Sequence, residues 1–272
     1  MVTGMRNEKI FFYSEDDSVY LETYISEQLG DYTRNAILIL PGGTYGTLSK
    51  REGEPIAQAF IPYGYNAFVL NYSVGRKRPF PVQLIEVSRA IKHIKDNAKQ
   101  YHINPDRVFV LGFSAGGHLA ASLGTMWDLK KIYEEIDMPY GYNRPTGMML
   151  IYSVINGYET FANQATFCNL LCTDNPKLDD LYTCSVDKNI KQNTVPAFLV
   201  HTSNDEMVNV KNSLAMANAL EEKGHKFELH IYPDGPHGMA LGNAITECGN
   251  SRWNNIAVSK WVEQAVLWAK NI

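Results

Sequence analysis

The sequence has 272 residues, a formal net charge of −4 at pH 7 and a hydrophobic fraction of 45%. This length is compatible with one domain that buries a large core, and we expect a single domain over residues 1–272. The chain has no block of Lys and Arg and no apolar run of membrane-spanning length, so neither nucleic acid nor a membrane is an expected partner.

The first nine residues carry charge and lack the apolar stretch of a secretory signal, which predicts a cytoplasmic protein. In that compartment the four cysteines are expected to be reduced thiols. These cysteines are Cys168, Cys172, Cys184 and Cys248. The first two lie four residues apart, but no histidines complete a metal-binding pattern around them. The sequence therefore indicates no metal and no other cofactor.

The predicted elements begin with a hairpin and continue as strands that alternate with helices. Residues 10–13 and 19–25 read as two strands around the turn residues Ser-Glu-Asp-Asp-Ser. The segment 36–40 is apolar throughout, which is typical of a strand buried on both faces of a parallel sheet. Further strands are predicted over residues 67–71, 108–111, 148–152, 197–201 and 227–232, and helices over residues 52–63, 82–99, 214–223 and 257–268, with one more directly after Ser114.

This alternation predicts an α/β fold with a mostly parallel central sheet, an antiparallel N-terminal hairpin and helices on both faces. Two polar segments between strands, at about 128–146 and 154–194, are rich in Tyr, Asn and Asp and show no clear periodicity. Loops at the carboxyl ends of parallel strands border the ligand crevice in such folds. We therefore expect both segments to form walls of a substrate pocket.

A candidate nucleophile lies where the strand 108–111 meets the next helix. The residues Gly112-Phe-Ser-Ala-Gly116 have the G-x-S-x-G spacing. A serine on a sharp strand-to-helix turn projects its hydroxyl into a cleft, and the following backbone N–H faces an oxyanion. Glycines at both ends of the motif suit a turn in which strand and helix approach closely. These features make Ser114 the expected nucleophile.

His237 is the candidate base, because it lies in the Gly/Pro-rich loop that follows the last strand, 227–232. A serine nucleophile requires such a base to take its proton. The six other histidines fall in or next to helices and strands, where structural or surface roles are the common ones. They are His93, His102, His118, His201, His225 and His230.

Asp205 is the candidate acid that orients the base, because it follows the strand 197–201 directly. An aspartate in this place also suits a turn or a helix cap, and the adjacent Glu206 is an alternative acid. The order Ser114, Asp205, His237 is the order expected for a nucleophile on this type of turn.

The oxyanion of an acyl-transfer intermediate requires backbone N–H donors. The residue after the nucleophile, Ala115, supplies one. The others are expected from the loop after strand 36–40, where Pro-Gly-Gly-Thr44 lets the backbone approach a substrate closely. A Gly-Gly pair by itself is an ordinary turn. Because Ser114, Asp205 and His237 form a candidate catalytic triad, we expect the N–H groups of Gly43 and Thr44 to donate to the oxyanion.

Together these segments resemble the α/β-hydrolase superfamily and, within it, a bacterial group of acetyl-xylan, feruloyl and other sugar-ester esterases. The resemblance implies Ser114, Asp205 and His237 as the triad, and oxyanion donors near Gly43, Thr44 and Ala115. The stretches that carry it are Pro41-Gly-Gly-Thr-Tyr-Gly-Thr-Leu-Ser, Ile103-Asn-Pro-Asp-Arg-Val, Gly112-Phe-Ser-Ala-Gly-Gly-His-Leu-Ala, Val195-Pro-Ala-Phe-Leu-Val-His-Thr-Ser-Asn-Asp and Gly235-Pro-His-Gly-Met.

Two positions depart from the family pattern. Thr44 stands where the family more often has glycine, which keeps the N–H but reduces backbone freedom. The acid loop continues Met207-Val-Asn-Val, where family members usually have Val-Pro. Neither change affects a group that carries a proton in the expected mechanism.

The resemblance implies a serine esterase that hydrolyses short-chain esters, acetyl esters above all, of sugars or xylo-oligosaccharides. The expected partner is thus a small-molecule ester, and a homodimer is left open. Tyr133, Tyr140, Tyr142 and Tyr158 in the two polar segments are candidates to stack on sugar rings, although ordinary loop packing is the commoner role of a tyrosine. A general short-chain carboxylesterase, an amidase or peptidase of the same fold, and a non-catalytic ligand-binding protein are the alternatives.

Overall fold

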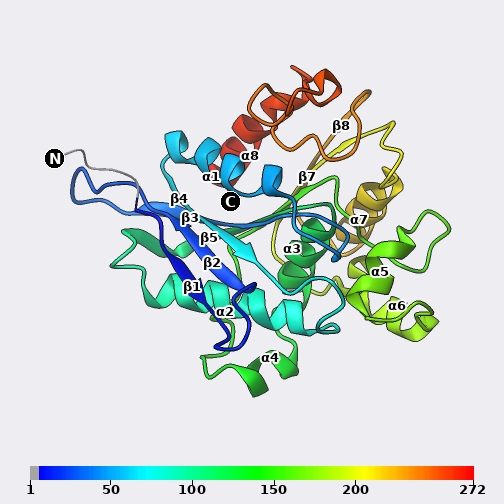
Figure 1. Cartoon of the computed structure of the whole chain (residues 1–272), viewed down its shortest axis with the longest axis horizontal. Helices are drawn as coiled ribbons and strands as arrows, with labels where there is room; N and C mark the ends of the chain where they lie inside the picture. The colour runs from blue at the N-terminus through cyan, green and yellow to red at the C-terminus, as the bar shows by residue number, and fades with distance from the viewer. Residues whose placement is uncertain (1–5) are drawn as a thin grey trace.

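The computed structural model describes residues 6–272, and within them eight strands form one twisted sheet that runs through the molecule (Figure 1). The order across the sheet is β1-β2-β4-β3-β5-β6-β7-β8. The strands are β1 (Lys9–Phe11), β2 (Tyr20–Tyr24), β3 (Arg34–Leu40), β4 (Tyr65–Asn71), β5 (Ile103–Phe113), β6 (Met148–Ile151), β7 (Ala197–Thr202) and β8 (Phe227–Tyr232).

The sheet is parallel except at its N-terminal edge. β2 pairs antiparallel with both β1 and β4, with Ile10 opposite Leu21 in the hairpin. From β4 to β8 every neighbouring pair is parallel. Their carboxyl ends therefore meet at one edge of the sheet, which is where ligands bind in open parallel sheets. The predicted fold class is confirmed.

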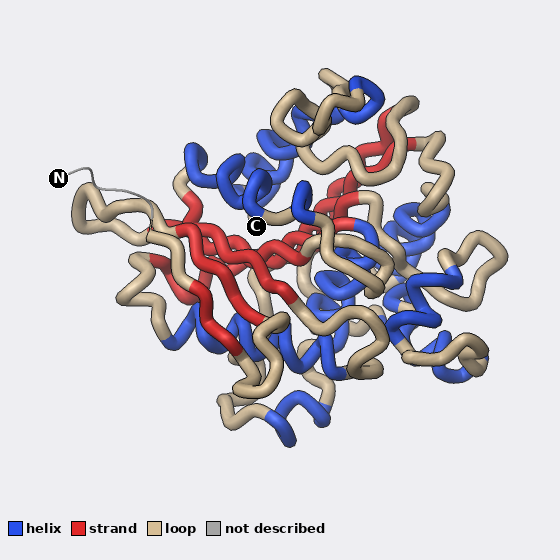
Figure 2. Tube along the Cα trace, viewed as in Figure 1, coloured by secondary structure: helices blue, strands red, loops and turns tan. Residues whose placement is uncertain are grey.

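Helices cover both faces of the sheet (Figure 2). Side chains of β3 alternate between two cores: Leu38 belongs to the core that includes residues of α2, α3 and α7, whereas Ile39 belongs to the core that includes residues of α1 and α8. This two-sided burial explains the continuous apolar run at 36–40. The helices are α1 (Glu54–Phe60), α2 (Val82–Asp96), α3 (Ser114–Met126), α4 (Lys130–Glu135), α5 (Gln164–Leu170), α6 (Leu178–Cys184), α7 (Lys211–Glu222) and α8 (Trp261–Lys270).

Several element boundaries differ from the prediction, and the largest shift is at β5. β5 begins at Ile103, five residues before the predicted start, because the pairing with β3 skips from Arg34–Ile103 to Ala36–Val108. The intervening polar residues form a turn in which the Asn104 side chain accepts a hydrogen bond from the backbone of Asp106. The predicted helix 52–63 consists of α1 flanked by two 3₁₀ turns, Lys50–Glu52 and Ile61–Tyr63.

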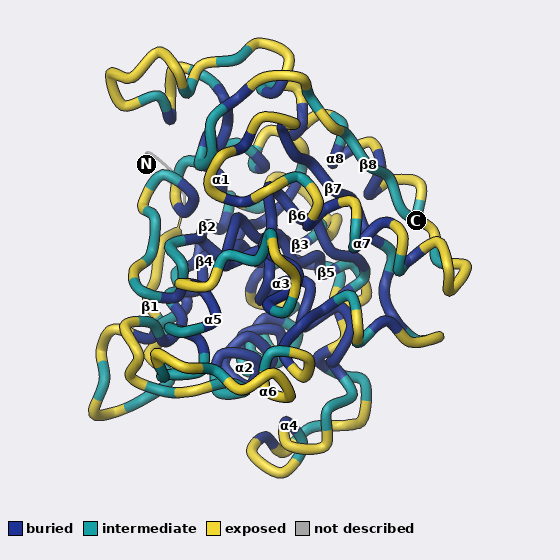
Figure 3. Tube along the Cα trace, turned by 90° about the vertical axis from the view of Figure 1, so that its right-hand side faces the viewer, coloured by how far each residue is buried: buried dark blue, intermediate teal, exposed yellow. Residues whose placement is uncertain are grey.

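The two polar segments lie at opposite edges of the sheet. Residues 128–146 contain α4 and enter β6 at its amino end, where Thr146 bonds to the backbone of Val108. Ser114 follows the carboxyl end of β5, at the opposite edge of the sheet, and the role of residues 128–146 as a pocket wall stays a prediction. A loop that leads from a helix into a parallel strand always arrives at the far edge. Figure 3 shows the chain around α4 largely exposed, whereas α3 is buried.

Residues 154–194 contain α5 and α6 and leave β6 at its carboxyl end, beside the serine turn. The backbone N–H of Val154 donates to the carbonyl of Ser114 at 3.1 Å. The Asn169 side chain donates to the carbonyl of Thr44 at 2.9 Å. The role of this segment as a pocket wall stays a prediction.

All four cysteines are free thiols, and only Cys184 is buried. Among the described residues, no helix is long and apolar enough to cross a membrane.

Candidate active site

Ser114 occupies a strained turn between β5 and α3. Its φ is +51°, a left-handed conformation that a residue with a side chain rarely adopts. The turn is tight because the two flanking glycines touch backbone. A Cβ added to Gly112 would lie 2.1 Å from the carbonyl oxygen of Gly116, and one added to Gly116 would lie 2.1 Å from that of Leu40. The sequence motif therefore marks two positions that only glycine can occupy.

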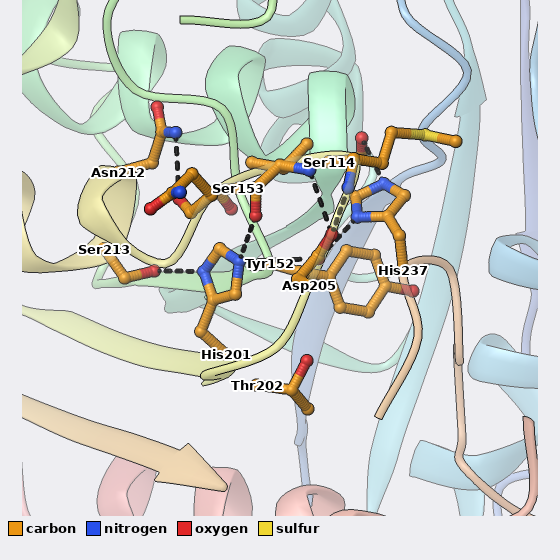
Figure 4. A network of polar contacts seen from close by, with 12 residues as sticks. Ser114, Tyr152, Ser153, His201, Thr202, Asp205, Asn212, Ser213 and His237 are labelled. Atoms are coloured by element: carbon orange, nitrogen blue, oxygen red, sulfur yellow. Dashed lines mark hydrogen bonds and ion pairs between the residues drawn. The ribbon is translucent and has the colours of Figure 1, made fainter. Parts of the chain in front are cut away.

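The structure brings Ser114, His237 and Asp205 into one hydrogen-bonded chain (Figure 4). The imidazole Nε2 of His237 lies 2.9 Å from Ser114 Oγ, and its Nδ1 lies 2.7 Å from Asp205 Oδ2. A carboxylate only accepts hydrogen bonds, so Nδ1 carries the proton and Nε2 accepts from the serine hydroxyl. The three residues follow β5, β7 and β8, which are parallel strands whose carboxyl ends lie at the same edge of the sheet.

The Asp205 carboxylate is stabilised in its charged form. It is buried, which favours the neutral acid, yet hydrogen bonds from His201 and His237 hold the pKa of this carboxyl well below its usual range. Oδ1 also accepts from the backbone N–H groups of Met207 and Val208, both at 2.9 Å. These contacts orient the acid toward the imidazole. Glu206, the alternative acid, is exposed and makes no contact with His237 among those recorded for residues 6–272.

His201 supports the acid loop from behind. Its Nε2 lies 2.8 Å from the carbonyl of Val208 and 3.5 Å from Asp205 Oδ2, and its Nδ1 lies 2.8 Å from the hydroxyl of Ser213 (Figure 4). A carbonyl accepts only, so Nε2 carries the proton and Nδ1 accepts from the hydroxyl. Its place inside β7 gave no signal of this role.

His118 is a second buried histidine with a structural position. Its ring nitrogens bond to the Tyr45 hydroxyl and to the carbonyl of Cys184, both at 2.8 Å. Burial lowers the pKa of His118 to about 4, so the ring is neutral at pH 7. It thereby ties α3 both to the loop after β3 and to α6.

The loop after β3 has the shape expected of an oxyanion hole. Gly43 and Thr44 both have positive φ, and within residues 6–272 their backbone N–H groups, like that of Ala115, have no recorded acceptor. The N–H of Gly42 is already bonded, to Glu52 Oε2 at 2.8 Å. Free donors of this kind beside a nucleophile suit a developing negative charge.

Glu52 and Tyr152 form a buried pair beneath this loop that sequence reasoning did not find. Burial raises the pKa of the Glu52 carboxyl, and hydrogen bonds from the Tyr152 hydroxyl and Gly42 act against that rise. The Tyr152 hydroxyl in turn accepts from the N–H of Ala240, and the tyrosine ring packs against the His237 ring at 4.9 Å between centroids. Because a glutamate at the start of a predicted helix is commonly a cap residue, the sequence did not indicate that Glu52 is a buried hydrogen-bond partner of Gly42 and Tyr152.

The tyrosines proposed for sugar stacking are mostly engaged elsewhere. Tyr133 and Tyr140 pack together beside α4, with ring centroids 5.4 Å apart, and the Tyr142 hydroxyl bonds to Asp96. All three lie in the segment 128–146, at the far edge of the sheet from Ser114. Tyr158 bonds to Asp187 and stacks on Tyr182. No contact of these four rings with Ser114 is recorded among residues 6–272.

This arrangement supports acyl transfer. A neutral imidazole can take the serine proton, a fixed carboxylate can stabilise the imidazolium that results, and nearby N–H groups can hold an oxyanion. Among residues 6–272, no group of three or more His, Cys, Asp or Glu side chains is placed to hold a metal ion.

Comparison with known proteins gives consistent matches. The BD-FAE family model matches residues 21–220. An endo-1,4-beta-xylanase B of Butyrivibrio fibrisolvens is 36% identical over 221 residues, which are 78% of this chain and 34% of that protein. An acetylxylan esterase of Xylanibacter ruminicola is 30% identical over 236 residues, which are 84% of this chain and 45% of that protein. The chain thus spans about a third to a half of the length of these relatives.

A solved structure matches over the full length. The acetyl ester-xyloside bifunctional hydrolase from Caldicellulosiruptor lactoaceticus superposes with a TM-score of 0.85 at 32% identity. The match covers 100% of this chain and 98% of that one. The sheet order, the helices on both faces and this superposition show the α/β-hydrolase fold.

Proposed function

The chain belongs to the BD-FAE family, and from this membership we propose that it is a serine esterase that hydrolyses short-chain, above all acetyl, esters of sugars or xylo-oligosaccharides. The observation that carries the proposal is the position of His237. Its two ring nitrogens lie within hydrogen-bond distance of Ser114 Oγ and Asp205 Oδ2, at 2.9 and 2.7 Å.

In the first half-reaction, Ser114 Oγ attacks the ester carbonyl while its proton moves to His237 Nε2. Asp205 holds the imidazole by Nδ1 and stabilises its charged form. The tetrahedral intermediate collapses when the carbon–oxygen bond to the alcohol breaks, and Nε2 returns its proton to the leaving alkoxide. An acyl-enzyme on Ser114 and a free alcohol result.

In the second half-reaction, water attacks the acyl-enzyme while His237 Nε2 takes a proton from it. Collapse of the second intermediate returns that proton to Ser114 Oγ and releases the carboxylic acid. In both intermediates the N–H groups of Gly43, Thr44 and Ala115 hold the oxyanion. One such donor typically contributes about 3–4 kcal/mol to the lowering of the barrier.

The substrate class rests on the named relatives. One is an acetylxylan esterase, one is a xylanase, and a structural neighbour is named for acetyl ester and xyloside hydrolysis. Acetylated xylo-oligosaccharides contain an acetyl ester bond, and the alcohol of that ester is a xylose hydroxyl, as in the substrates that these names describe. They are therefore the first substrates to test.

The decisive experiment compares substrates and a nucleophile variant. Acetate release from acetylated xylo-oligosaccharides is measured beside p-nitrophenyl esters of increasing acyl length, with wild type and Ser114→Ala. We expect wild type to prefer acetyl, and Ser114→Ala to lose nearly all turnover and all labelling by a fluorophosphonate probe. Equal turnover across acyl lengths without sugar-ester activity would favour a general carboxylesterase, and faster cleavage of matched amides would favour an amidase.

The cytoplasmic location stays a prediction of the sequence.

A further inference from the structure

A groove with a volume of about 550 Å³ lies beside His237. Three loops enclose it: residues 204–207 from the acid loop, residues 234–237 from the histidine loop, and residues 250–255, which precede α8 (Figure 1). Its volume falls within the usual range of small-molecule sites. The first two loops belong to the site described above, whereas nothing in the proposed mechanism uses the third.

The chemistry of ester cleavage indicates what this groove faces. His237 Nε2 gives its proton to the leaving alkoxide, so the alcohol part of the substrate must lie against the imidazole. His237 is also among the residues that line the groove, whereas Ser114 is not. The groove therefore begins beside His237, where an alcohol larger than a few atoms can extend into it once it is bound for this proton transfer.

The segment 250–255 is tied to the histidine loop. The Asn255 side chain donates to the carbonyl of Asp234 at 2.8 Å, and the Asn255 N–H donates to the carbonyl of Gly242 at 2.9 Å. The Asn250 side chain accepts from the N–H of Arg252 at 3.2 Å. These bonds hold the segment in a defined position relative to His237.

Trp253 is the aromatic side chain of the groove. The guanidinium of Arg51 lies 3.6 Å from its ring centroid, and Arg51 Nε donates to the carbonyl of Thr246 at 2.8 Å. A cation anchored over one face of an indole fixes the ring. The indole remains partly exposed and lines the groove, so it offers an apolar surface to the C–H face of a sugar ring.

The polar lining suits an uncharged ligand with many hydroxyl groups. Glu206 and Asp234 contribute carboxylates and Arg252 contributes one guanidinium. Within residues 6–272, the side chains of Glu206 and Arg252 have no recorded hydrogen bond or ion pair. Two carboxylates against one cation disfavour an anion. Sugar hydroxyls both donate and accept, so they match the carboxylates and the guanidinium alike.

We propose that this groove binds the sugar ring that carries the leaving hydroxyl, with Trp253 as its platform and with Glu206 and Arg252 as its hydroxyl partners. The proposal rests on the proposed function, because only an ester substrate has a leaving alcohol. In this proposal the segment 250–255 selects the alcohol part of the ester. The acyl part is bound elsewhere, near the oxyanion loop.

The test uses two acetyl esters with different alcohols. Acetylated xylo-oligosaccharide can cover Trp253, whereas the ethyl group of ethyl acetate is too small to stack on it. We expect Trp253→Ala to lower the ratio of kcat/KM for the sugar ester to kcat/KM for ethyl acetate about tenfold, mainly through KM. Trp253→Phe should retain most of the ratio. Tyr140→Ala removes an exposed aromatic ring at the far edge of the sheet and should leave the ratio at the wild-type value.

Calorimetric titration of xylotriose into the same variants separates the two proposals. If wild type cleaves the sugar ester but folded Trp253→Ala keeps the wild-type ratio, the groove proposal is overturned and the esterase proposal stands. If wild type cleaves no sugar ester yet binds xylotriose in a Trp253-dependent manner, the sugar-ester function and the leaving-group role of the groove both fail, and only sugar binding by the groove remains. Absence of both cleavage and binding overturns both.

Discussion

Glu52 accepts a hydrogen bond from the Tyr152 hydroxyl at 2.8 Å, although the two residues are 100 positions apart in the chain. Both side chains are buried. The other Glu52 oxygen holds the N–H of Gly42, next to the expected oxyanion donors, and the same tyrosine hydroxyl holds the N–H of Ala240, three residues after His237. One pair thus connects the loop that would hold the oxyanion to the loop that carries the proposed base.

Glu52→Ala should lower kcat by about 10- to 100-fold with little change in KM. The substitution leaves two buried donors, of Gly42 and Tyr152, without an acceptor, and each typically costs about 1–3 kcal/mol. The oxyanion loop then shifts, which affects the transition state more than substrate binding. Glu52→Gln, which keeps an acceptor for Gly42, should lose less. The measurement is steady-state hydrolysis of p-nitrophenyl acetate.

Glu54→Ala is the matched control, because Glu54 is an exposed glutamate two residues away in the first turn of α1. It should keep the wild-type kcat. An effect of Glu52→Ala on KM alone, or equal losses for both variants, would contradict the positioning role.

Asp205→Asn should lower kcat by about four orders of magnitude, because an amide cannot hold His237 in the tautomer that accepts the serine proton. Asp128→Asn serves as the control, since Asp128 pairs with Lys191. Circular dichroism of both variants establishes that they are folded. Near-normal turnover by Asp205→Asn would mean that another group, such as Glu206, orients the base.

Gly116→Ala should destabilise the fold by more than about 4 kcal/mol, because the added methyl group would lie 2.1 Å from the backbone oxygen of Leu40. Gly224→Ala is the comparison. Its φ of +72° carries strain, but nothing lies within 4 Å of the new Cβ, so we expect a loss of about 1 kcal/mol. Urea denaturation measures both, and equal losses would contradict the argument from close approach at Gly116.

The free energy of unfolding should fall as the pH decreases from about 6.5 toward 4. Burial lowers the pKa of His118 from 6.5 to about 4, so between these values the unfolded chain binds a proton that the folded chain excludes. This group alone should account for a loss of about 2 kcal/mol between about pH 7.5 and about pH 5. His118→Gln, which keeps a donor and an acceptor, should show a shallower dependence. An unchanged slope would assign the acid sensitivity to other groups.

Predictions made from local sequence patterns agree with the structure where contacts between neighbouring elements determine which residue types are allowed. The strand 36–40 is apolar throughout because both of its faces are covered, and Gly112 and Gly116 are required because backbone passes within contact distance of each. Boundaries were less accurate at β5, where polar residues at 104–106 interrupt the apolar pattern although the strand begins before them.

The sequence by itself determined the order of elements, the serine turn and the candidates for acid and base, because periodicity, glycine and residue order are local properties. Only the tertiary structure decided that His201 supports the acid loop and that Glu52 meets Tyr152. These facts depend on which strands are neighbours in the sheet. Sheet order brings together residues about a hundred positions apart, and no local pattern records it.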